Sequence, residues 1–153
     1  VLAFFLYGVT EALLVSVIST IFILGYSTTM GVGATMKFIA TVPMFLVPAA
    51  LLRLPFFSEK DSGAFKRILV VSAAGFFAIV VRLIVSTIAN YYWAIPLFLG
   101  MPSDVVLQRN FGNSIWAFIV FVASMNVLQG VVDILAPWLL AFRLGLSERF
   151  RTW

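Results

Sequence analysis

Cysteine and histidine are both absent from the 153 residues of this chain. Their absence excludes disulfide bonds, thiolate nucleophiles, histidine general bases and zinc sites built from these two residue types. Charged residues make up only 10% of the chain, whereas a soluble domain carries roughly 25%. The six acidic residues are scattered, and no pair has the D-x-x-D spacing of a metal site. The composition therefore predicts a protein that is not an enzyme and that holds no cofactor or metal.

Hydrophobic residues, in contrast, make up 63% of the chain, and the mean hydropathy is +1.12. A helix that spans a membrane needs about 20 mostly apolar residues. The sequence predicts an all-α, polytopic transmembrane bundle of about four helices in one domain, and these helices cover residues 1–24, 31–54, 66–96 and 113–143. Because the chain opens inside an apolar run, we expect it to be truncated at its N-terminus.

Basic residues gather in two of the segments outside the predicted helices. Residues 53–67 carry four basic and two acidic side chains, and the C-terminal tail carries three arginines against one acid. Residues 25–30 have no charge, and residues 100–113 have one charge of each sign. Because basic loops stay in the cytoplasm, we expect a multi-pass protein of the cell membrane whose loop 53–67 and C-terminus are cytoplasmic. The net charge of +4 arises in these segments, so nucleic-acid binding is not expected.

Four charged residues lie away from the ends of the predicted helices: Glu11, Lys37, Arg82 and Asp133. A charge in the hydrocarbon region is costly, so each one calls for a partner or a function. At the helical rise per residue, Glu11 and Arg82 each lie about 20 Å from the outer end of their helix. The equal depth predicts a structural ion pair of Glu11 with Arg82, with Asp133 nearby.

Other polar side chains form stripes along the predicted helices, because residues three or four apart share a helix face. The candidate substrate-binding residues form three such pairs: Lys37 with Thr41, Asn90 with Trp93, and Asn126 with Gln129. Such stripes either bridge helices by hydrogen bonds or line a pocket for a polar small molecule. The sequence leaves both alternatives open. For Lys37 there is a third alternative, in which its long side chain extends to the outer membrane interface.

Three stretches of the chain resemble one transporter family. They are STTMGVGATMKFIATVPMFLVPAALLR (27–53), IVSTIANYYWAIPLFLGMP (84–102) and MNVLQGVVDILAPWLL (125–140). In this order they resemble the third to sixth helices of the substrate-binding S components of energy-coupling factor (ECF) vitamin transporters, most closely the riboflavin-type branch. Members of this family typically have six helices, so the resemblance implies that this chain supplies the last four.

The resemblance implies a membrane-embedded subunit of an ECF-type ABC importer that captures a vitamin or related micronutrient, with riboflavin as the lead candidate. It also implies three kinds of partner besides the lipid bilayer: the small-molecule substrate, a transmembrane coupling subunit and two ATPase subunits. The chain itself lacks the P-loop motif of an ATPase.

The family's ligand contacts carry over unevenly to this sequence. Asn90 and Asn126 match asparagines of the family's fifth and sixth helices. Gln129 stands where the riboflavin branch commonly has lysine, and Lys37 stands where that branch commonly has asparagine. Relative to the riboflavin branch, the lysine has thus moved from position 129 to position 37. This exchange either suits a ligand that carries a carboxylate or phosphate near Lys37, or it preserves one positive charge within a pocket that both positions share.

Two other classes of protein use the same kinds of residue. A non-transport membrane scaffold resembling the rod-shape protein MreD would need its polar stripes only to bridge helices. A lipid-modifying membrane enzyme would need clustered acidic residues or a histidine at the membrane surface, and the sequence offers neither. The importer and the scaffold differ in whether the polar side chains converge on a cavity or are satisfied between helices.

Overall fold

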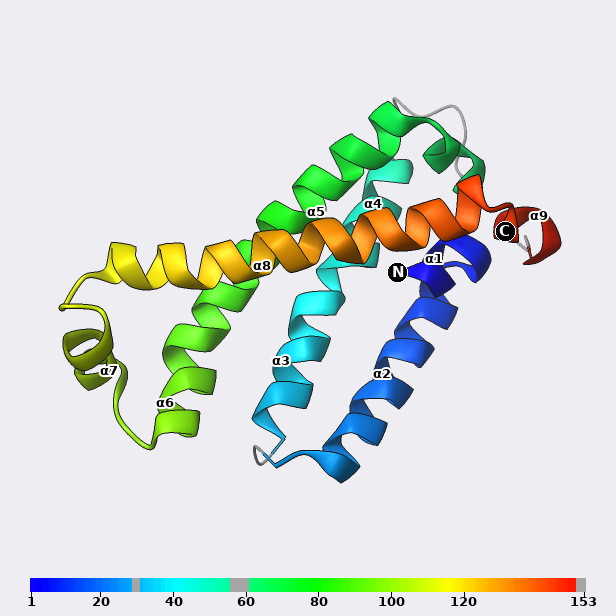
Figure 1. Ribbon diagram of the computed structural model, residues 1–153. Coiled ribbons are helices and arrows are strands. Elements are labelled where there is room, and N and C mark those ends of the chain that lie inside the picture. Colours follow the sequence, from blue (N-terminus) through cyan, green and yellow to red (C-terminus); the bar gives the residue numbers. More distant parts are fainter. Residues whose placement is uncertain (29–30, 56–60, 151–153) are drawn as a thin grey trace.

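The structure is a computed structural model that describes residues 1–28, 31–55 and 61–150. Every regular element within these ranges is a helix (Figure 1). Four helical segments are long and apolar enough to cross a membrane: Val9–Tyr26, Val32–Leu52, Ile68–Leu99 and Ile115–Arg143. The predicted all-α fold class with four spans is therefore confirmed, although residues 56–60 of the basic loop and residues 151–153 lie outside the described residues.

The first predicted helix is divided at Gly8 into α1 (Leu2–Tyr7) and α2 (Val9–Tyr26). Gly8 has a φ of 109°, a backbone conformation that glycine adopts without steric cost. α1 is buried, and the rings of Phe4 and Phe5 pack against Phe65 with centroid distances of 5.6 and 5.4 Å. α2 is mostly uncovered by the rest of the protein, so the break separates a core helix from a peripheral one.

Proline residues mark further irregularities in the spans. The second span consists of α3 (Val32–Thr41) and α4 (Pro43–Leu52), and the third consists of α5 (Ile68–Ala89), a π-helical turn (Asn90–Ala94) and α6 (Ile95–Leu99). Proline has no N–H, and its ring clashes with the carbonyl group four residues earlier, so it interrupts the helical hydrogen-bond pattern. Pro43 is the first residue of α4. Pro96 cannot donate a hydrogen bond to the carbonyl group four residues earlier, and that carbonyl group lies in the π-helical turn.

The remaining elements include a short 3₁₀ helix (Ser62–Lys66) before α5. A short helix, α7 (Ser103–Asn110), precedes the fourth span, which consists of α8 (Ile115–Trp138) and a π-helical turn (Leu139–Arg143), and α9 (Leu146–Phe150) follows. Figure 1 shows α2 and α6 ending near the end of the molecule where α3 begins, while α4 ends and α5 begins at the opposite end. Over the first three spans this alternation is the one that successive membrane crossings require, whereas α8 runs across them.

α8 crosses α5 at a steep angle, and glycines on both helices allow a close approach (Figure 1). A Cβ atom on Gly130 would lie 2.9 Å from Cγ1 of Ile79, and one on Gly75 would lie 2.9 Å from Cδ1 of Ile134. Small residues at such crossings let helix backbones pack closely in a membrane. The α5–α8 crossing is therefore a packed interface in which each helix supplies both a glycine and an isoleucine.

Trp138 ties the end of α8 to the segment that precedes α5. Its indole Nε1 donates a buried hydrogen bond to the carbonyl oxygen of Phe65, at 2.8 Å. We expect Trp138→Phe to lower the free energy of unfolding by at least about 1 kcal/mol, the net value of one such bond, because phenylalanine cannot donate and its smaller ring also leaves a gap in the packing. Unfolding of the full-length protein in detergent, followed by circular dichroism, measures the change. Trp116→Phe is the matched control, since Trp116 is exposed, and an equal loss in both variants would contradict the prediction.

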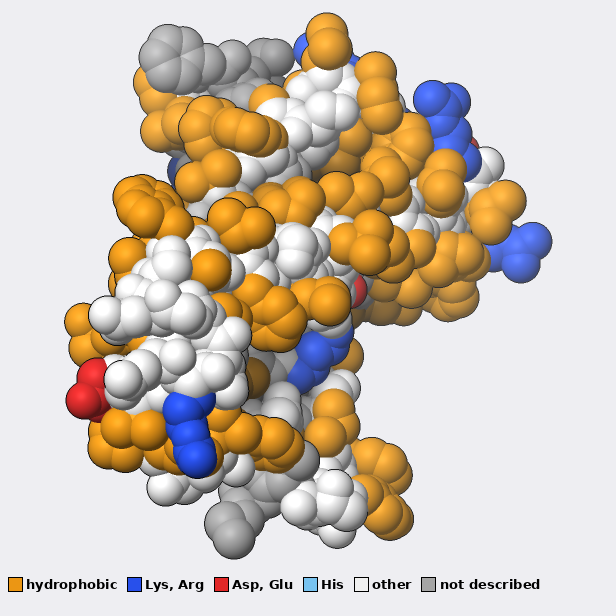
Figure 2. Space-filling model, turned by 60° about the vertical axis from the view of Figure 1, so that its left-hand side comes forward, with side chains coloured by type: hydrophobic (Ala, Val, Ile, Leu, Met, Phe, Trp, Pro, Cys, Tyr) orange, Lys and Arg blue, Asp and Glu red, His pale blue; other side chains and the backbone are white. Residues whose placement is uncertain are grey.

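Most of the outer surface is apolar. Figure 2 shows hydrophobic side chains across the greater part of one face of the molecule. Exposed leucine, isoleucine, valine and phenylalanine side chains occur along α2, α5 and α8. A soluble protein rarely exposes so large an apolar surface, so the chain is membrane-embedded, as the hydropathy predicts.

Candidate functional site

A polar groove lies between α2 and α3 and has a volume of about 180 Å³. Its lining residues are Ser16, Ser19, Thr20 and Ile23 from α2, and Lys37, Phe38 and Thr41 from α3. On each helix every lining residue has another three or four positions away, so each set lies on one side of its helix. Two of the predicted substrate-binding residues, Lys37 and Thr41, therefore face a common cavity with three hydroxyl side chains of the neighbouring helix.

The hydroxyl groups of the groove differ in whether they are already engaged. Ser16 Oγ donates to the carbonyl oxygen of Ala12 at 2.8 Å, and Thr20 Oγ1 donates to that of Ser16 at 2.7 Å. Ser19, Thr41 and Lys37 form no side-chain hydrogen bond or ion pair within the described ranges. The groove thus offers the ammonium group of Lys37 and two hydroxyl groups that remain free to donate.

Lys37 gives the groove its charge. It lies about 9 Å along the helix from Gly31, so its Cα is well inside the span. None of the seven lining residues is acidic. The Lys37 side chain is exposed in the structure, and its ammonium group contributes a positive charge at the groove.

A second polar cluster joins α5 to α8 and contains the buried ion pair. Arg82 is fully buried, and its NH1 atom donates to Oδ2 of Asp133 at 2.6 Å. Its Nε atom donates to Oδ1 of Asn126 at 3.2 Å. Asn126 and Asp133 are two turns apart on one face of α8, which allows both to reach the same guanidinium group. This cluster links two helices, as expected for a polar bridge in a membrane bundle.

The partner of Arg82 is therefore Asp133, and the pairing of Arg82 with Glu11 expected from depth alone does not form. Glu11 is exposed and makes no ion pair with any residue that the structure describes. The break at Gly8 places Glu11 in the first turn of α2, where the free N–H groups of a helix start favour a negative charge. The depth of Glu11 depends only on residues 11–25, which lie within α2, so the break at Gly8 does not alter it; equal depth alone does not direct the Glu11 side chain toward Arg82.

The four other predicted substrate-binding residues do not line the groove. Asn126 belongs to the Arg82 cluster and also donates to the carbonyl oxygen of Val122 at 2.9 Å. Asn90 donates to the carbonyl oxygen of Ser86, on its own helix, at 2.8 Å. The side chains of Trp93 and Gln129 are exposed. The six candidates thus fall into four settings: Lys37 and Thr41 in the groove, Asn126 in the helix bridge, Asn90 bonded within its own helix, and Trp93 and Gln129 on the surface.

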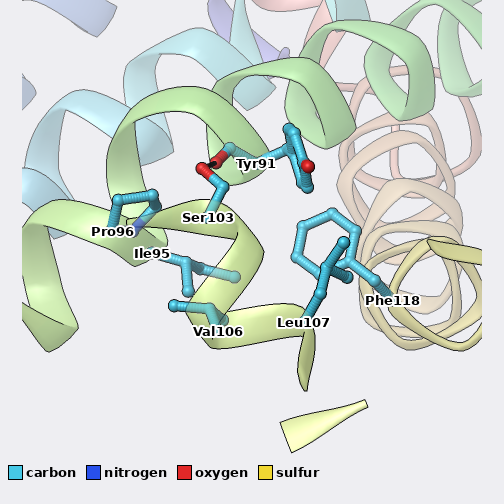
Figure 3. A pocket seen from close by; sticks show the side chains of 7 residues that line it. All are labelled: Tyr91, Ile95, Pro96, Ser103, Val106, Leu107 and Phe118. Atoms are coloured by element: carbon cyan, nitrogen blue, oxygen red, sulfur yellow. Dashed lines mark hydrogen bonds between the residues drawn. The ribbon is translucent and has the colours of Figure 1, made fainter. Parts of the chain in front are cut away.

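A further set of side chains, between α6, α7 and the start of α8, is packed rather than open. Figure 3 shows Ser103 directed at the backbone of Tyr91, and its Oγ donates to that carbonyl oxygen at 2.6 Å. The ring of Tyr91 packs edge-on against Phe118 with a centroid distance of 5.5 Å. The space among these residues admits no water molecule. This region anchors α7 and offers no room for a ligand.

The serine and threonine residues of α2 were not among the predicted site residues. The spacing of Ser16, Ser19 and Thr20 already indicates a polar face on an otherwise apolar helix. Serine and threonine are common in membrane helices, however, because their hydroxyl groups bond to their own backbone, as two of these do. Only the pairing of α2 with α3 brings this face opposite Lys37 and Thr41.

The fold and these two polar clusters define an α-helical, multi-pass membrane protein. No protein-family model matches the chain, and neither a curated protein nor a solved structure is detectably similar to it. Any finer assignment therefore depends on the groove, the Arg82 cluster and the sequence motifs themselves.

Proposed function

We propose that this chain is the membrane-embedded substrate-binding subunit of an ECF-type importer, and that it captures a vitamin or related micronutrient. The observation that carries the proposal is the groove between α2 and α3, where a cation and two free hydroxyl groups line a cavity of about 180 Å³. Ligand pockets typically combine apolar walls with a few polar groups that fix orientation. The three resembling stretches described above also support it.

The proposal includes an orientation and partners. With the basic loop 53–67 and the C-terminus in the cytoplasm, Lys37 lies in the outer half of the membrane, accessible to a substrate that arrives from outside. A transmembrane coupling subunit and two ATPase subunits would then supply the energy for release inside. Riboflavin is the first ligand to test.

A scaffold without transport function is the second candidate, and the Arg82 cluster favours it. In that cluster Asn126 and Asp133 are satisfied between α5 and α8. Asn90 is likewise satisfied within its own helix. A scaffold requires only such bridging hydrogen bonds between helices. It does not require a groove with free hydrogen-bond donors, so the groove favours the importer.

Ligand titration of the full-length protein in detergent separates the two functions. We expect riboflavin or another vitamin to change the intrinsic tryptophan fluorescence in a saturable manner. Thr41→Val, which keeps the side-chain shape but removes the hydroxyl group, should weaken that binding by about fivefold, equivalent to one neutral hydrogen bond. Thr87→Val on α5 is the matched control and should bind as the parent does. If a folded protein responds to no vitamin in the panel, the scaffold becomes the better assignment.

A further inference from the structure

We infer that the groove between α2 and α3 binds the oxyanion group, a carboxylate or a phosphate, of an amphipathic ligand. The inference rests on the proposed binding function and specifies the chemical class of its ligand. It is carried by Lys37, which lines the groove and has no acidic partner within ion-pair distance among the described residues.

Charge balance is the first reason for an anion. A solitary ammonium group within a membrane span is unfavourable unless a counter-charge or water compensates it. Arg82 shows how this chain compensates a buried cation, because Asp133 lies 2.6 Å away. Among the described residues no carboxylate lies within ion-pair distance of Lys37, so a ligand oxyanion would supply the negative charge.

The donors around Lys37 are the second reason. Carboxylate and phosphate oxygens accept hydrogen bonds and do not donate when ionised. Ser19 and Thr41 have free hydroxyl hydrogens, whereas Ser16 and Thr20 already donate to backbone carbonyls. The groove therefore presents donors from both helices, as an acceptor-only group requires.

The size and walls of the groove define the rest of the ligand. About 180 Å³ is an order of magnitude more than the 10–15 Å³ that one water molecule requires. It is nevertheless smaller than the roughly 300 Å³ at which pockets for whole drug-sized ligands begin. Ile23 and Phe38 form apolar walls beside the polar groups. The groove thus accommodates an acidic head group with a small apolar part, and a longer ligand would extend out of it.

Four pairs of probes that differ mainly in their acid group test this inference. They are nicotinate and nicotinamide, pantothenate and panthenol, biotin and biotin amide, and riboflavin 5′-phosphate and riboflavin. Each is titrated against the full-length protein in phosphatidylcholine nanodiscs. In at least one pair the anion should bind at least tenfold more tightly. Lys37→Gln should abolish that preference, while Lys66→Gln, which removes an exposed lysine far from the groove in sequence, should keep it.

A lipid head group offers the same chemistry, so a second arm uses nanodiscs that contain phosphatidylglycerol. If this lipid raises the thermal stability of the parent but not of Lys37→Gln, and no soluble probe binds, the oxyanion site stands and the proposed importer fails. If neutral probes bind as tightly as their acids and Lys37→Gln changes neither, the oxyanion site is overturned and the importer stands. If a folded protein responds to neither the probes nor the lipid, both are overturned.

Discussion

Replacing Asp133 with alanine is expected to lower the free energy of unfolding by about 3–5 kcal/mol. Arg82 is completely buried, and Asp133 supplies its only ion pair among the described residues. Removing the carboxylate leaves a guanidinium group in the bundle with only Asn126 as an acceptor. The loss is measured by denaturant unfolding of the full-length protein in detergent, followed by circular dichroism.

Two further variants make this prediction specific. Glu11→Ala is the matched control, because it also removes one carboxylate from a predicted span but leaves the ion pair intact; it should cost less than about 1 kcal/mol. The double variant Arg82→Met with Asp133→Leu should recover much of the stability lost in Asp133→Ala, since no charge then remains unpaired. If Glu11→Ala costs as much as Asp133→Ala, the pairing described here is incorrect.

Gly130→Ala is expected to lower the free energy of unfolding by about 1–3 kcal/mol through overpacking. The added methyl group would lie 2.9 Å from Cγ1 of Ile79, 3.4 Å from its Cδ1 and 3.7 Å from Cε of Met44. Because Cγ1 is close to the backbone of α5, the helices must separate slightly or Ile79 must change its rotamer. The same unfolding experiment measures this cost.

Other glycines provide the comparison for Gly130. Gly75→Ala should cost less, since its clash is with the terminal Cδ1 atom of Ile134, which moves more easily. Gly25→Ala on α2 should cause no loss, because its Cβ atom would meet nothing within 4 Å and alanine favours a helix. Adding Ile79→Ala to Gly130→Ala should cost less than the sum of the two single changes. Equal losses at Gly25 and Gly130 would contradict the close crossing.

The fold class and the four spans follow from composition because a membrane helix is specified by length and apolarity alone. α7 was missed, since an eight-residue helix of mixed polarity gives no such signal. The glycine at position 8 could be read in the sequence, but glycine is frequent in membrane helices, and only the structure shows that it breaks this one.

The candidate site was only partly predictable for a different reason. Helical periodicity correctly places Lys37 and Thr41 on one face, and it also groups Asn126 with Asp133. It does not give the rotation of one helix against the next or the angle at which α8 crosses α5. Those two quantities direct Asn126 toward Arg82 and bring the hydroxyl groups of α2 opposite Lys37. Only the three-dimensional structure therefore shows which predicted residues line the groove and which bridge α5 and α8.

The uneven covering of the two helices that form the groove has a consequence for its dynamics. Only 6% of Val9–Tyr26 is buried by the rest of the protein, compared with 33% of an 18-residue stretch within Val32–Leu52. α2 is attached to the buried α1 through Gly8, whose backbone tolerates a wide range of φ and ψ. Elements with few buried contacts open at the lowest free-energy cost. We therefore expect α2 to move more readily than α3, and such a movement would change the width of the groove.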